Sequence, residues 1–458
     1  MTDRFIIAID ELKSAFGDRL TTNLTVRQQH AHTMSWLDNE PADAVLTVTD
    51  KYQIAKAIKI CHAHKMPVVA FGAGSSLEGQ LNAPCGGLCI DMSQMTNIIS
   101  INADDLTATV EAGVTREQLN EALRYTGLFF PIDPGANASI GGMTATRASG
   151  TNAVRYGTMK DVVLCLEVVL PNGEIIKTAS RAKKSSAGYD LTRLMIGSEG
   201  TLGIITEITV KLFGQPECVG SGVCHFETIE NACQTVMTTI QYGLPVARLE
   251  LLDAIQIKAC NAYSKLSLQE KPTLFVEFHG TQSGVIEQAQ IFADIMAEFG
   301  GTDFKWSSDE SERKKLWTAR HNAYYATRAL KPEFEILSTD ACVPISRLAE
   351  CVTDTVADIQ EQGMIGPVVG HVGDGNFHVL LLLDKNNPDD VAKTKGILSR
   401  LAKRAIDMGG TCTGEHGIGQ GKRTYMASEY DEQALCVMKL IKQAIDPNNI
   451  MNPDKIWF

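Results

Sequence analysis

Three glycine-rich loops constrain what this chain can fold into more than any other feature of its sequence. They occupy residues 72–79, 133–142 and 197–203, and the first follows a strand-like stretch. Successive backbone N–H groups in such loops form nests for phosphate oxygens. Taken alone, the first loop could equally be a tight surface turn, and it lacks the glycine spacing of the dinucleotide fingerprint. The three loops together predict one large phosphate-bearing cofactor.

Strand and helix patterns alternate around these loops. Residues 44–71 read as strand, helix and strand, a βαβ opening that favours a nucleotide-binding fold. Gly214-Gln215-Pro216 interrupts the pattern, and we expect a domain boundary there. The periodicity predicts strands at 44–48, 67–71, 162–170, 203–212 and 273–279, a hairpin at 370–384, and helices at 6–20, 51–64, 117–125, 285–299, 311–330, 391–408 and 425–444.

Length and charge narrow the class of protein. The 458 residues exceed what one hydrophobic core serves, so two or three subdomains are expected. A net charge of -12, with no basic run, argues against nucleic acid and acidic membrane surfaces as partners. The twelve cysteines include no Cys-x-x-Cys pair, which argues against iron–sulfur clusters and a disulfide framework. Because no stretch resembles a signal peptide or a membrane span, we expect a cytoplasmic protein, with a peripheral position at a membrane face as the alternative.

Two short histidine-containing stretches, residues 370–378 and 413–419, suggest a metal site with a base beside it. If Asp374-Gly375 is a two-residue hairpin turn, His371 pairs with His378, and both imidazoles lie on one face with their Cβ atoms about 5 Å apart. Glu415 would supply a third, oxygen ligand. Three protein ligands leave positions open for substrate, as catalytic metal sites do. The alternative is an ordinary hairpin that carries two histidines.

The order of the glycine motifs resembles the flavin-binding domain of the vanillyl-alcohol oxidase superfamily. The motifs are Gly72-x-Gly74-Ser75-Ser76, Pro134-Gly135, Gly141-Gly142, Gly150-x-x-x-x-Arg155-Tyr156-Gly157 and residues 197–203. The second half, with both histidine stretches and Asn452-Pro453, resembles the cap domain of the D-2-hydroxyacid dehydrogenase branch. Within that branch the likeness is to FAD-dependent D-lactate dehydrogenases, with D-2-hydroxyglutarate and glycolate enzymes as near relatives.

The resemblance implies an α+β fold. A two-subdomain FAD-binding domain would span residues 1–215, a cap domain with an antiparallel sheet residues 216–424, and a segment that returns to the FAD domain residues 425–458. It also implies non-covalent FAD, because Ser75 and Ser76 stand where covalent members often present a histidine. The residues implied in cofactor binding are Gly72, Ala73, Gly74, Ser75, Ser76, Gly79, Pro134, Gly135, Ser139, Gly141, Gly142, Gly150, Tyr156, Gly157, Glu199, Gly200, Gly203, Ile205 and Asn452.

The same resemblance assigns roles around the metal. His371, His378 and Glu415 would hold Zn²⁺ or Mn²⁺, with Fe²⁺ less favoured. His416 would be the general base, although an imidazole could also be a fourth metal ligand. Arg320 would hold the substrate carboxylate through two parallel hydrogen bonds, unless it is one more solvated charge on a basic helix face. Tyr324 and Asn376 would line the substrate site, Asn376 bonding either the substrate or the flavin.

The sequence therefore predicts an FAD- and metal-dependent dehydrogenase of D-lactate or a similar short D-2-hydroxy acid. Ser338-Thr339-Asp340 stands where hydroxyglutarate enzymes are more basic, which favours a short substrate over D-2-hydroxyglutarate, whereas glycolate stays open. A non-haem metal oxygenase or hydrolase would leave the glycine loops unexplained, and a non-catalytic flavoprotein subunit would not need the metal ligands. An external acceptor is expected, a quinone, a cytochrome or an electron-transfer flavoprotein, and a homodimer is the candidate assembly.

Overall fold

The computed structural model describes residues 5–33 and 36–457, which form two compact units. Unit 1 takes Met1–Ser149, Gly157–Gln215 and Glu415–Phe458, and unit 2 takes Gly150–Tyr156 and Pro216–Gly414. The sequence predicts boundaries after residues 215 and 424. In the structure the second crossing follows Gly414, and unit 2 also gains residues 150–156, which no change of composition marks.

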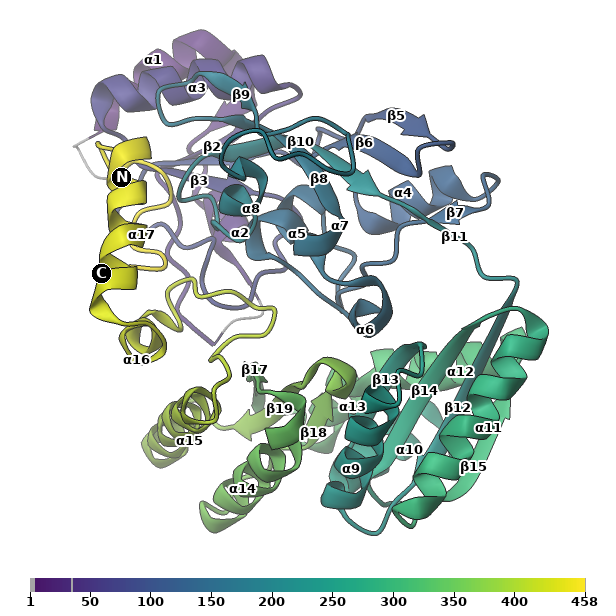
Figure 1. The fold of residues 1–458 in the computed structure, drawn as a ribbon. Helices are drawn as coiled ribbons and strands as arrows, with labels where there is room; N and C mark the ends of the chain where they lie inside the picture. The colour runs from purple at the N-terminus through teal and green to yellow at the C-terminus, as the bar shows by residue number, and fades with distance from the viewer. Residues whose placement is uncertain (1–4, 34–35, 458) are drawn as a thin grey trace. The chain divides into compact units, whose positions relative to one another are not determined.

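Unit 1 contains three sheets with helices packed around them (Figure 1). Their orders are β1-β2-β4-β3, β5-β6-β10-β8-β9 and β11-β7. The strands are β1 (Leu20–Thr21), β2 (Ala44–Thr47), β3 (Val68–Phe71), β4 (Leu88–Asp91), β5 (Ile98–Asn102), β6 (Thr107–Glu111), β7 (Leu128–Phe129), β8 (Val163–Val169), β9 (Ile175–Lys177), β10 (Ile204–Lys211) and β11 (Phe213–Gly214). The helices are α1 (Ile6–Phe16), η2 (Gly17–Arg19), α2 (Leu24–Ala31), α3 (Lys51–His64), α4 (Arg116–Leu123), α5 (Ile140–Thr146), α7 (Met159–Val162), α8 (Leu191–Met195), η5 (Arg423–Tyr425), α16 (Met426–Glu429) and α17 (Glu432–Ile445).

The βαβ opening matches the predicted bounds to within one residue, since β2 ends at Thr47 and β3 begins at Val68. Asp50 caps α3 by accepting the backbone N–H groups of Tyr52 and Gln53, and the helix ends at Lys65 in the left-handed region. Strands β2 and β3 both pair in parallel with β4. Apolar residues of the two larger sheets share one core cluster, so they form a single hydrophobic body.

The last segment of the chain is part of unit 1. Met451 forms a parallel bridge with Val68, supported by backbone hydrogen bonds from Val68 N to Ile450 O (2.7 Å) and from Asn452 N to Val68 O (2.8 Å). Residues far apart in the sequence thus meet at the edge of the first sheet.

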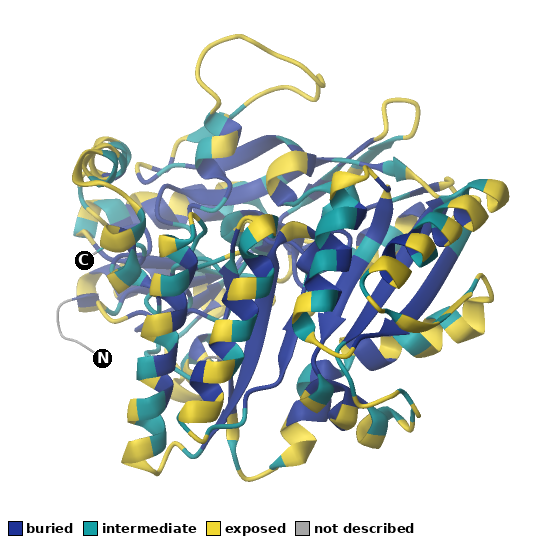
Figure 2. Cartoon of the chain, turned by 60° about the horizontal axis from the view of Figure 1, so that its bottom comes forward, coloured by how far each residue is buried: buried dark blue, intermediate teal, exposed yellow. Residues whose placement is uncertain are grey.

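Unit 2 is built on an eight-stranded antiparallel sheet, in the order β15-β12-β14-β13-β18-β19-β16 with β17 also paired to β19. Its strands are β12 (Cys218–His225), β13 (Val246–Leu252), β14 (Thr273–Gly280), β15 (Thr302–Ser307), β16 (Glu335–Ser338), β17 (Ala341–Cys342), β18 (Val368–Gly370) and β19 (Asn376–Leu383). Its helices are α6 (Ala153–Tyr156), α9 (Ile229–Gln241), α10 (Ala254–Ser264), α11 (Gln282–Glu298), α12 (Glu310–His321), α13 (Ala323–Leu330), η3 (Ile345–Arg347), α14 (Leu348–Glu361), η4 (Val372–Asp374) and α15 (Pro388–Asp407). The central strands are dark blue in Figure 2, whereas the helices show yellow outer faces.

Two sequence predictions in unit 2 need correction. The helix expected at 311–330 is two helices, because the chain leaves helical geometry at Asn322. The hairpin does not turn at Asp374-Gly375 alone: Asp374 lies in the 3-10 turn η4, and of these two residues only Gly375 has a positive φ, +78°. A two-residue type I′ turn needs positive φ at both positions. Val369, not His371, is therefore the strand partner of His378.

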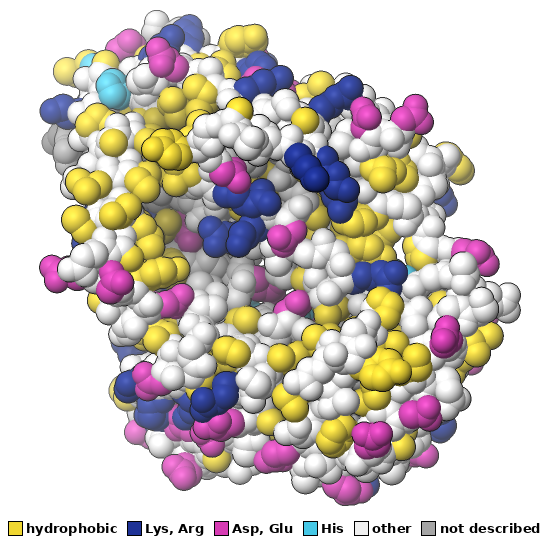
Figure 3. Space-filling model, in the orientation of Figure 1, with side chains coloured by type: hydrophobic (Ala, Val, Ile, Leu, Met, Phe, Trp, Pro, Cys, Tyr) yellow, Lys and Arg dark blue, Asp and Glu magenta, His cyan; other side chains and the backbone are white. Residues whose placement is uncertain are grey.

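Two further observations concern the described residues as a set. Among them, no helix combines the length and the apolar character that a membrane span requires. On the face drawn in Figure 3, acidic and basic side chains are interspersed.

Candidate functional site

The first two glycine loops meet in unit 1. A side chain at Gly72 would collide with the Oγ of Ser139, and one at Gly141 would lie 2.6 Å from the Cβ of Ala112. Ser139 also caps α5 by accepting the backbone N–H of Gly142. Gly74 has a φ of +71°, which a residue with a Cβ rarely adopts. Close backbone approach, rather than mobility, explains these glycines.

The first loop offers a polar atom for a ligand. The Oγ of Ser76 is buried and forms no hydrogen bond to any described residue. Buried hydroxyls in native proteins are nearly always satisfied, so this position fits a bound polar group. By contrast, Gly135 in the second loop is exposed with open space around it, so its position has no steric need for glycine.

Two of the residues expected at the cofactor, Glu199 and Asn452, make hydrogen bonds within unit 1. The buried carboxylate of Glu199 accepts the backbone N–H groups of Ile418 (2.7 Å) and Gly419 (2.8 Å). Asn452 donates to the carbonyls of Glu199 (2.7 Å) and Gln80 (3.2 Å). Burial raises the pKa of Glu199 to about 7, although the two backbone donors oppose the rise. Glu199 and Asn452 thus brace the loop that carries Glu415 and His416, and their contact with a cofactor stays a prediction.

Two more of these residues pack in the unit 1 sheet, and the motif at 150–157 divides between the units. Ile205 is buried in β10, and a side chain at Gly203 would lie 2.7 Å from Val168. Gly157 belongs to unit 1, whereas the hydroxyl of Tyr156 bonds the Nδ1 of His279 at 2.6 Å within unit 2.

His371 and His378 lie side by side in unit 2 despite the different register. Their ring centroids are 5.4 Å apart, with the planes at 82°. The Nδ1 of His378 donates to the backbone carbonyl of Thr339 at 2.8 Å, and the Nδ1 of His371 bonds the Oε1 of Glu250 at 2.7 Å. A carbonyl and a carboxylate only accept, so both Nδ1 atoms donate, and in the neutral imidazole each Nε2 atom then presents a lone pair. Metal-binding histidines in proteins are oriented in this way.

Glu415 completes a possible ligand set. It directly follows Gly414, and His371, His378 and Glu415 each offer one ligand atom within 4.8 Å of the others. Two imidazoles and a carboxylate suit Zn²⁺, Mn²⁺ or Fe²⁺. The described residues therefore fit the metal that the sequence predicts.

Arg320 is buried, with 9% of its surface exposed, so it is not a solvated charge on a helix face. Its Nε and Nη2 donate to the Oε2 of Glu250 at 2.9 and 2.5 Å. Burial alone would raise the pKa of Glu250, but the charge of Arg320 and the hydrogen bonds from Arg320 and His371 outweigh it and hold that pKa below its ordinary value. Glu250 thus joins the predicted metal ligand to the predicted carboxylate-binding arginine.

The two other predicted substrate residues have different surroundings. Tyr324 lies on α13, not on the helix of Arg320, and is half-buried against apolar residues of the sheet. Asn376 is buried, and its amide nitrogen donates to Asp340 (2.8 Å) and to the carbonyl of Ala341 (2.9 Å). Only the side-chain oxygen of Asn376 is left as a candidate ligand contact.

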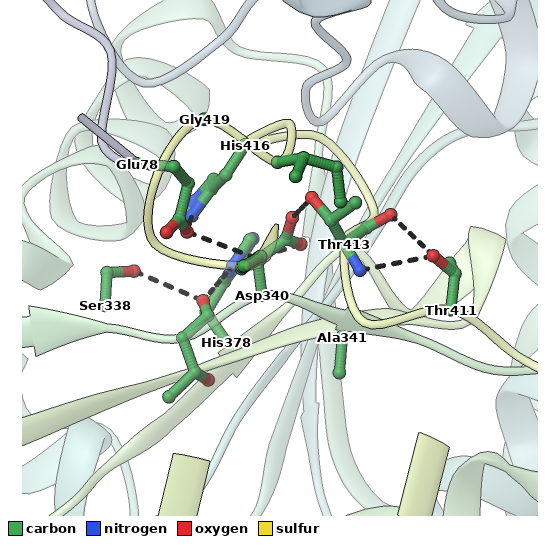
Figure 4. Close-up of polar contacts among 12 residues, drawn as sticks. Glu78, Ser338, Asp340, Ala341, His378, Thr411, Thr413, His416 and Gly419 are labelled. Atoms are coloured by element: carbon green, nitrogen blue, oxygen red, sulfur yellow. Dashed lines mark hydrogen bonds and ion pairs between the residues drawn. The ribbon is translucent and has the colours of Figure 1, made fainter. Parts of the chain in front are cut away.

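His416 lies beside a carboxylate in unit 1. Its Nδ1 is 3.4 Å from the Oε1 of Glu78, and the two side chains are drawn together in Figure 4. The Nζ of Lys422 is 3.2 Å from the same oxygen, and the backbone N–H of Gln420 donates to the carbonyl of Glu78 at 2.7 Å. The loop after His416 therefore packs around Glu78, whose carboxylate lies next to the imidazole.

Sequence reasoning missed Glu78, Glu250 and Asp340. Asp340 accepts a hydrogen bond from the Oγ1 of Thr413 at 2.9 Å (Figure 4) and thereby supports the second histidine stretch. Glu78 lies in the first glycine-rich loop and Asp340 in the stretch 338–340, but neither position indicates which residue it contacts. Glu250 did carry a signal: it is a single acidic residue within the strand-like run 249–252, where burial without a partner would be costly.

Family models match most of the chain. The model described as "FAD binding domain" matches residues 42–179, and the model described as "FAD linked oxidases, C-terminal domain" matches residues 215–456. The chain belongs to the FAD-linked oxidase family. It is therefore an FAD-dependent oxidoreductase, as the resemblance of its motifs predicts.

Curated relatives and solved structures agree with this assignment. The chain is 47% identical over 452 residues to "Probable D-lactate dehydrogenase, mitochondrial" of Danio rerio, which covers 98% of this chain and 91% of the relative. It is 44% identical to "D-lactate dehydrogenase [cytochrome], mitochondrial" of Arabidopsis thaliana, over 98% of this chain and 79% of the relative. It is 36% identical to glycolate oxidase subunit GlcD of Bacillus subtilis, over 91% and 89%. A p-cresol methylhydroxylase structure with substrate bound has a TM-score of 0.84 at 18% identity, covering 100% of this chain and 97% of the other, and confirms the predicted α+β fold of the flavin-binding type.

The same comparison overturns one expectation. Relatives of the FAD-linked oxidase that are 44–47% identical to it are named as mitochondrial proteins, so the predicted cytoplasmic location is wrong. That prediction rested on charge and on the lack of an apolar span. Neither property determines the compartment in which a protein is found.

Proposed function

We propose that this FAD-linked oxidase oxidises D-lactate, or a similarly short D-2-hydroxy acid, to the 2-oxo acid. The observation that carries the proposal is the joint hydrogen bonding of His371 and Arg320 to Glu250, beside a second histidine whose Nε2 also presents a lone pair. A metal-ligand set and a carboxylate-binding group in one network suit a substrate with adjacent hydroxyl and carboxylate groups. The names of the Danio rerio and Arabidopsis thaliana relatives support D-lactate.

Different residues of the chain would bind the substrate carboxylate and the metal. Arg320 would bind the substrate carboxylate through the guanidinium edge that Glu250 leaves open, and His371, His378 and Glu415 would hold Zn²⁺ or Mn²⁺. When bound, the metal would supply Lewis-acid polarisation of the substrate hydroxyl, and FAD, which the glycine loops would hold, would supply the hydride acceptor.

His416 would take the hydroxyl proton. An imidazole titrates near neutral pH, and a neighbouring carboxylate such as Glu78 stabilises the imidazolium that forms. If His416 is a fourth metal ligand instead, its replacement will weaken metal binding, a difference that the experiments below measure.

Substrate length follows from what the neighbouring polar groups already do. The Thr339 carbonyl is bonded to His378 and the Asp340 carboxylate to Asn376 and Thr413, so this stretch adds no cation for a second acidic arm. We therefore favour lactate over hydroxyglutarate. Glycolate is the second candidate, because the Bacillus subtilis relative is named a glycolate oxidase subunit.

We infer that an external acceptor reoxidises the flavin. The Arabidopsis thaliana relative carries "[cytochrome]" in its name, which favours a cytochrome over a quinone or an electron-transfer flavoprotein. Acceptors can be ranked by the rate at which each restores the flavin absorbance.

The test is the visible spectrum of the purified protein under anaerobic conditions. D-lactate should bleach the flavin band, whereas an equal concentration of L-lactate should not. Glycolate and D-2-hydroxyglutarate serve as comparison substrates. Bleaching by L-lactate alone, or by hydroxyglutarate but not by D-lactate, would refute the proposed substrate.

A further inference from the structure

Two buried glutamates lie on adjacent strands of the unit 2 sheet, and each holds one arginine and one histidine. Glu250 on β13 bonds Arg320 and His371. Glu277 on β14 bonds His279 at 2.9 Å and lies 3.6 Å from Arg248, its neighbour across the strands. Arg248 and Glu250 are two residues apart on β13, so the two clusters share one face of the sheet.

The clusters differ in what they hold. The Glu277 cluster continues to Ser221 (2.8 Å), whose hydroxyl accepts the indole N–H of Trp317 (3.0 Å), and to Tyr156 through His279. The partners of Glu250 are instead a predicted metal ligand and a predicted substrate-binding arginine. The two clusters therefore have the same chemistry, but only the Glu250 cluster contains a predicted metal ligand and the predicted carboxylate-binding arginine.

Glu250 fixes two orientations at once. Its Oε1 accepts from His371, which keeps the proton on Nδ1 and the lone pair on Nε2. Its Oε2 accepts from both Nε and Nη2 of Arg320, which sets the plane of the guanidinium. The side chain of Glu250 is 0% exposed, so water cannot replace either bond.

We propose that Glu250 is a positioning residue shared by the metal site and the substrate carboxylate site. It holds the His371 imidazole and the Arg320 guanidinium as one hydrogen-bonded unit, so a change at Glu250 alters metal binding and substrate binding together. The proposal rests on the proposed function.

The main test is the Zn²⁺ dissociation constant, measured by calorimetry on the FAD-loaded, metal-stripped protein. Loss of a partner that orients a metal-bound histidine typically weakens metal binding 10–100-fold, and we expect a loss of about that size in Glu250→Gln. The KM for D-lactate should rise by about tenfold or more in the same variant, because Arg320 loses its fixed plane. The ¹⁵N chemical shifts of His371 should show a mixture of tautomers.

Glu277→Gln is the matched control, because it removes the same charge from an Arg-Glu-His cluster on the same sheet face. It should lose stability as Glu250→Gln does, yet bind Zn²⁺ within about twofold of the wild type. Equal losses of Zn²⁺ affinity in both variants would overturn the proposal, because they would show a general structural role. A wild-type affinity in Glu250→Gln would overturn it as well.

Glu250→Asp provides a second variant if Glu250→Gln does not fold. It keeps the charge, but its shorter side chain cannot reach both partners. A Zn²⁺ affinity within about twofold of the wild type in this variant would overturn the proposal. If the wild-type protein binds no Zn²⁺, the predicted metal site is wrong, which is a different result from a failure of the proposal about Glu250. In that case the KM for D-lactate in Glu250→Asp decides whether Glu250 positions Arg320.

Discussion

At the scale of single residues, His416 lies against Glu78, a carboxylate far away in the sequence. The pair has a counterpart at the surface of the same unit, where His64 bonds the Oε2 of Glu11 at 2.8 Å. The two pairs have similar chemistry but different settings: the side chain of His416 is 8% exposed and that of His64 is 29% exposed. This difference allows a controlled test of the base.

We expect His416→Asn to lower kcat for D-lactate by about 10²–10⁴-fold, the usual contribution of a general base. FAD content and the Zn²⁺ dissociation constant should stay unchanged. Anaerobic stopped-flow reduction of the flavin measures the step directly. His64→Asn is the matched control and should reduce its flavin at the wild-type rate. If Zn²⁺ binding falls together with flavin reduction, His416 is a metal ligand rather than the base.

Residues inside motifs could be predicted from the sequence, and their partners could not. The spacing of the histidine stretches identifies His371, His378 and Glu415, which the structure brings within ligand distance of one another. Glu250 and Glu78 are positioned by the pairing of distant strands and loops, which a single sequence does not encode in any local pattern. Asn376 lies inside a motif and was predicted at the substrate site, but the hydrogen bond from its amide nitrogen to Asp340 was not predicted.

At the scale of elements, the loop after His416 is held in part by the buried side chain of Glu199. Glu199 accepts the N–H groups of Ile418 and Gly419, and a side chain at Gly417 would lie 2.7 Å from its Oε1. Burial raises the pKa of Glu199 from 4.5 to about 7. A carboxyl that binds its proton more tightly in the folded state stabilises the fold fully below the unfolded pKa, and this contribution is lost as the pH rises through 7.

The free energy of unfolding of the wild type should therefore fall between about pH 4.5 and pH 7, and Glu199 should account for roughly 3 kcal/mol of the fall. Glu199→Gln should lose that share of the slope, because an amide does not titrate. Urea denaturation at pH 5 and pH 8 measures both proteins. Asp253, whose pKa burial also raises to about 7, contributes equally to both proteins and cancels. Identical slopes in the two proteins would contradict the assignment.

The hairpin shows why element bounds are easier to predict than register. The run 376–383 is fully buried and was readable as a strand from its apolar residues. The turn before it combines η4 with Gly375, whose Cβ position is occupied by the carbonyl of Val343. That carbonyl comes from a distant part of the chain. The rings of His371 and His378 still meet, because the 3-10 turn brings His371 back over the sheet.

At the scale of the whole molecule, the cofactor loops and the metal histidines belong to different units. Gly72 and Ser139 lie in unit 1, whereas His371 and His378 lie in unit 2. The third predicted metal ligand, Glu415, belongs to unit 1, but none of the three ligands lies in a glycine-rich loop, so loading of one group should not require loading of the other.

Removal of the metal should therefore leave the flavin in place. Dialysis against a chelator should lower turnover of D-lactate by at least about 100-fold, since a Lewis acid contributes several kcal/mol. The flavin absorbance per protein should stay constant, and added Zn²⁺ or Mn²⁺ should restore turnover. The metal content of the dialysed protein is measured by atomic absorption. A metal-free protein with wild-type turnover would refute the role of the metal.

The division into units could be predicted only in part. The breakers at residues 214–216 mark the crossing after Gln215 in the sequence, but the crossing after Gly414 and the insertion of residues 150–156 are defined by packing alone. Asn152 of that insertion accepts a hydrogen bond from Arg248 at 3.0 Å. A contact between residues so far apart in the sequence cannot be predicted from local sequence patterns.

The pairing of Val68 with Met451 has a consequence for the order of events during synthesis. The ribosome delivers all of residues 216–414 before Met451 leaves the exit tunnel, so unit 2 can acquire its sheet while the first sheet of unit 1 still lacks its last partner. Until Met451 emerges, the edge of β3 at Val68 lacks its backbone partner. Nascent chains halted before residue 450 should for that reason depend on chaperones more than chains released after it.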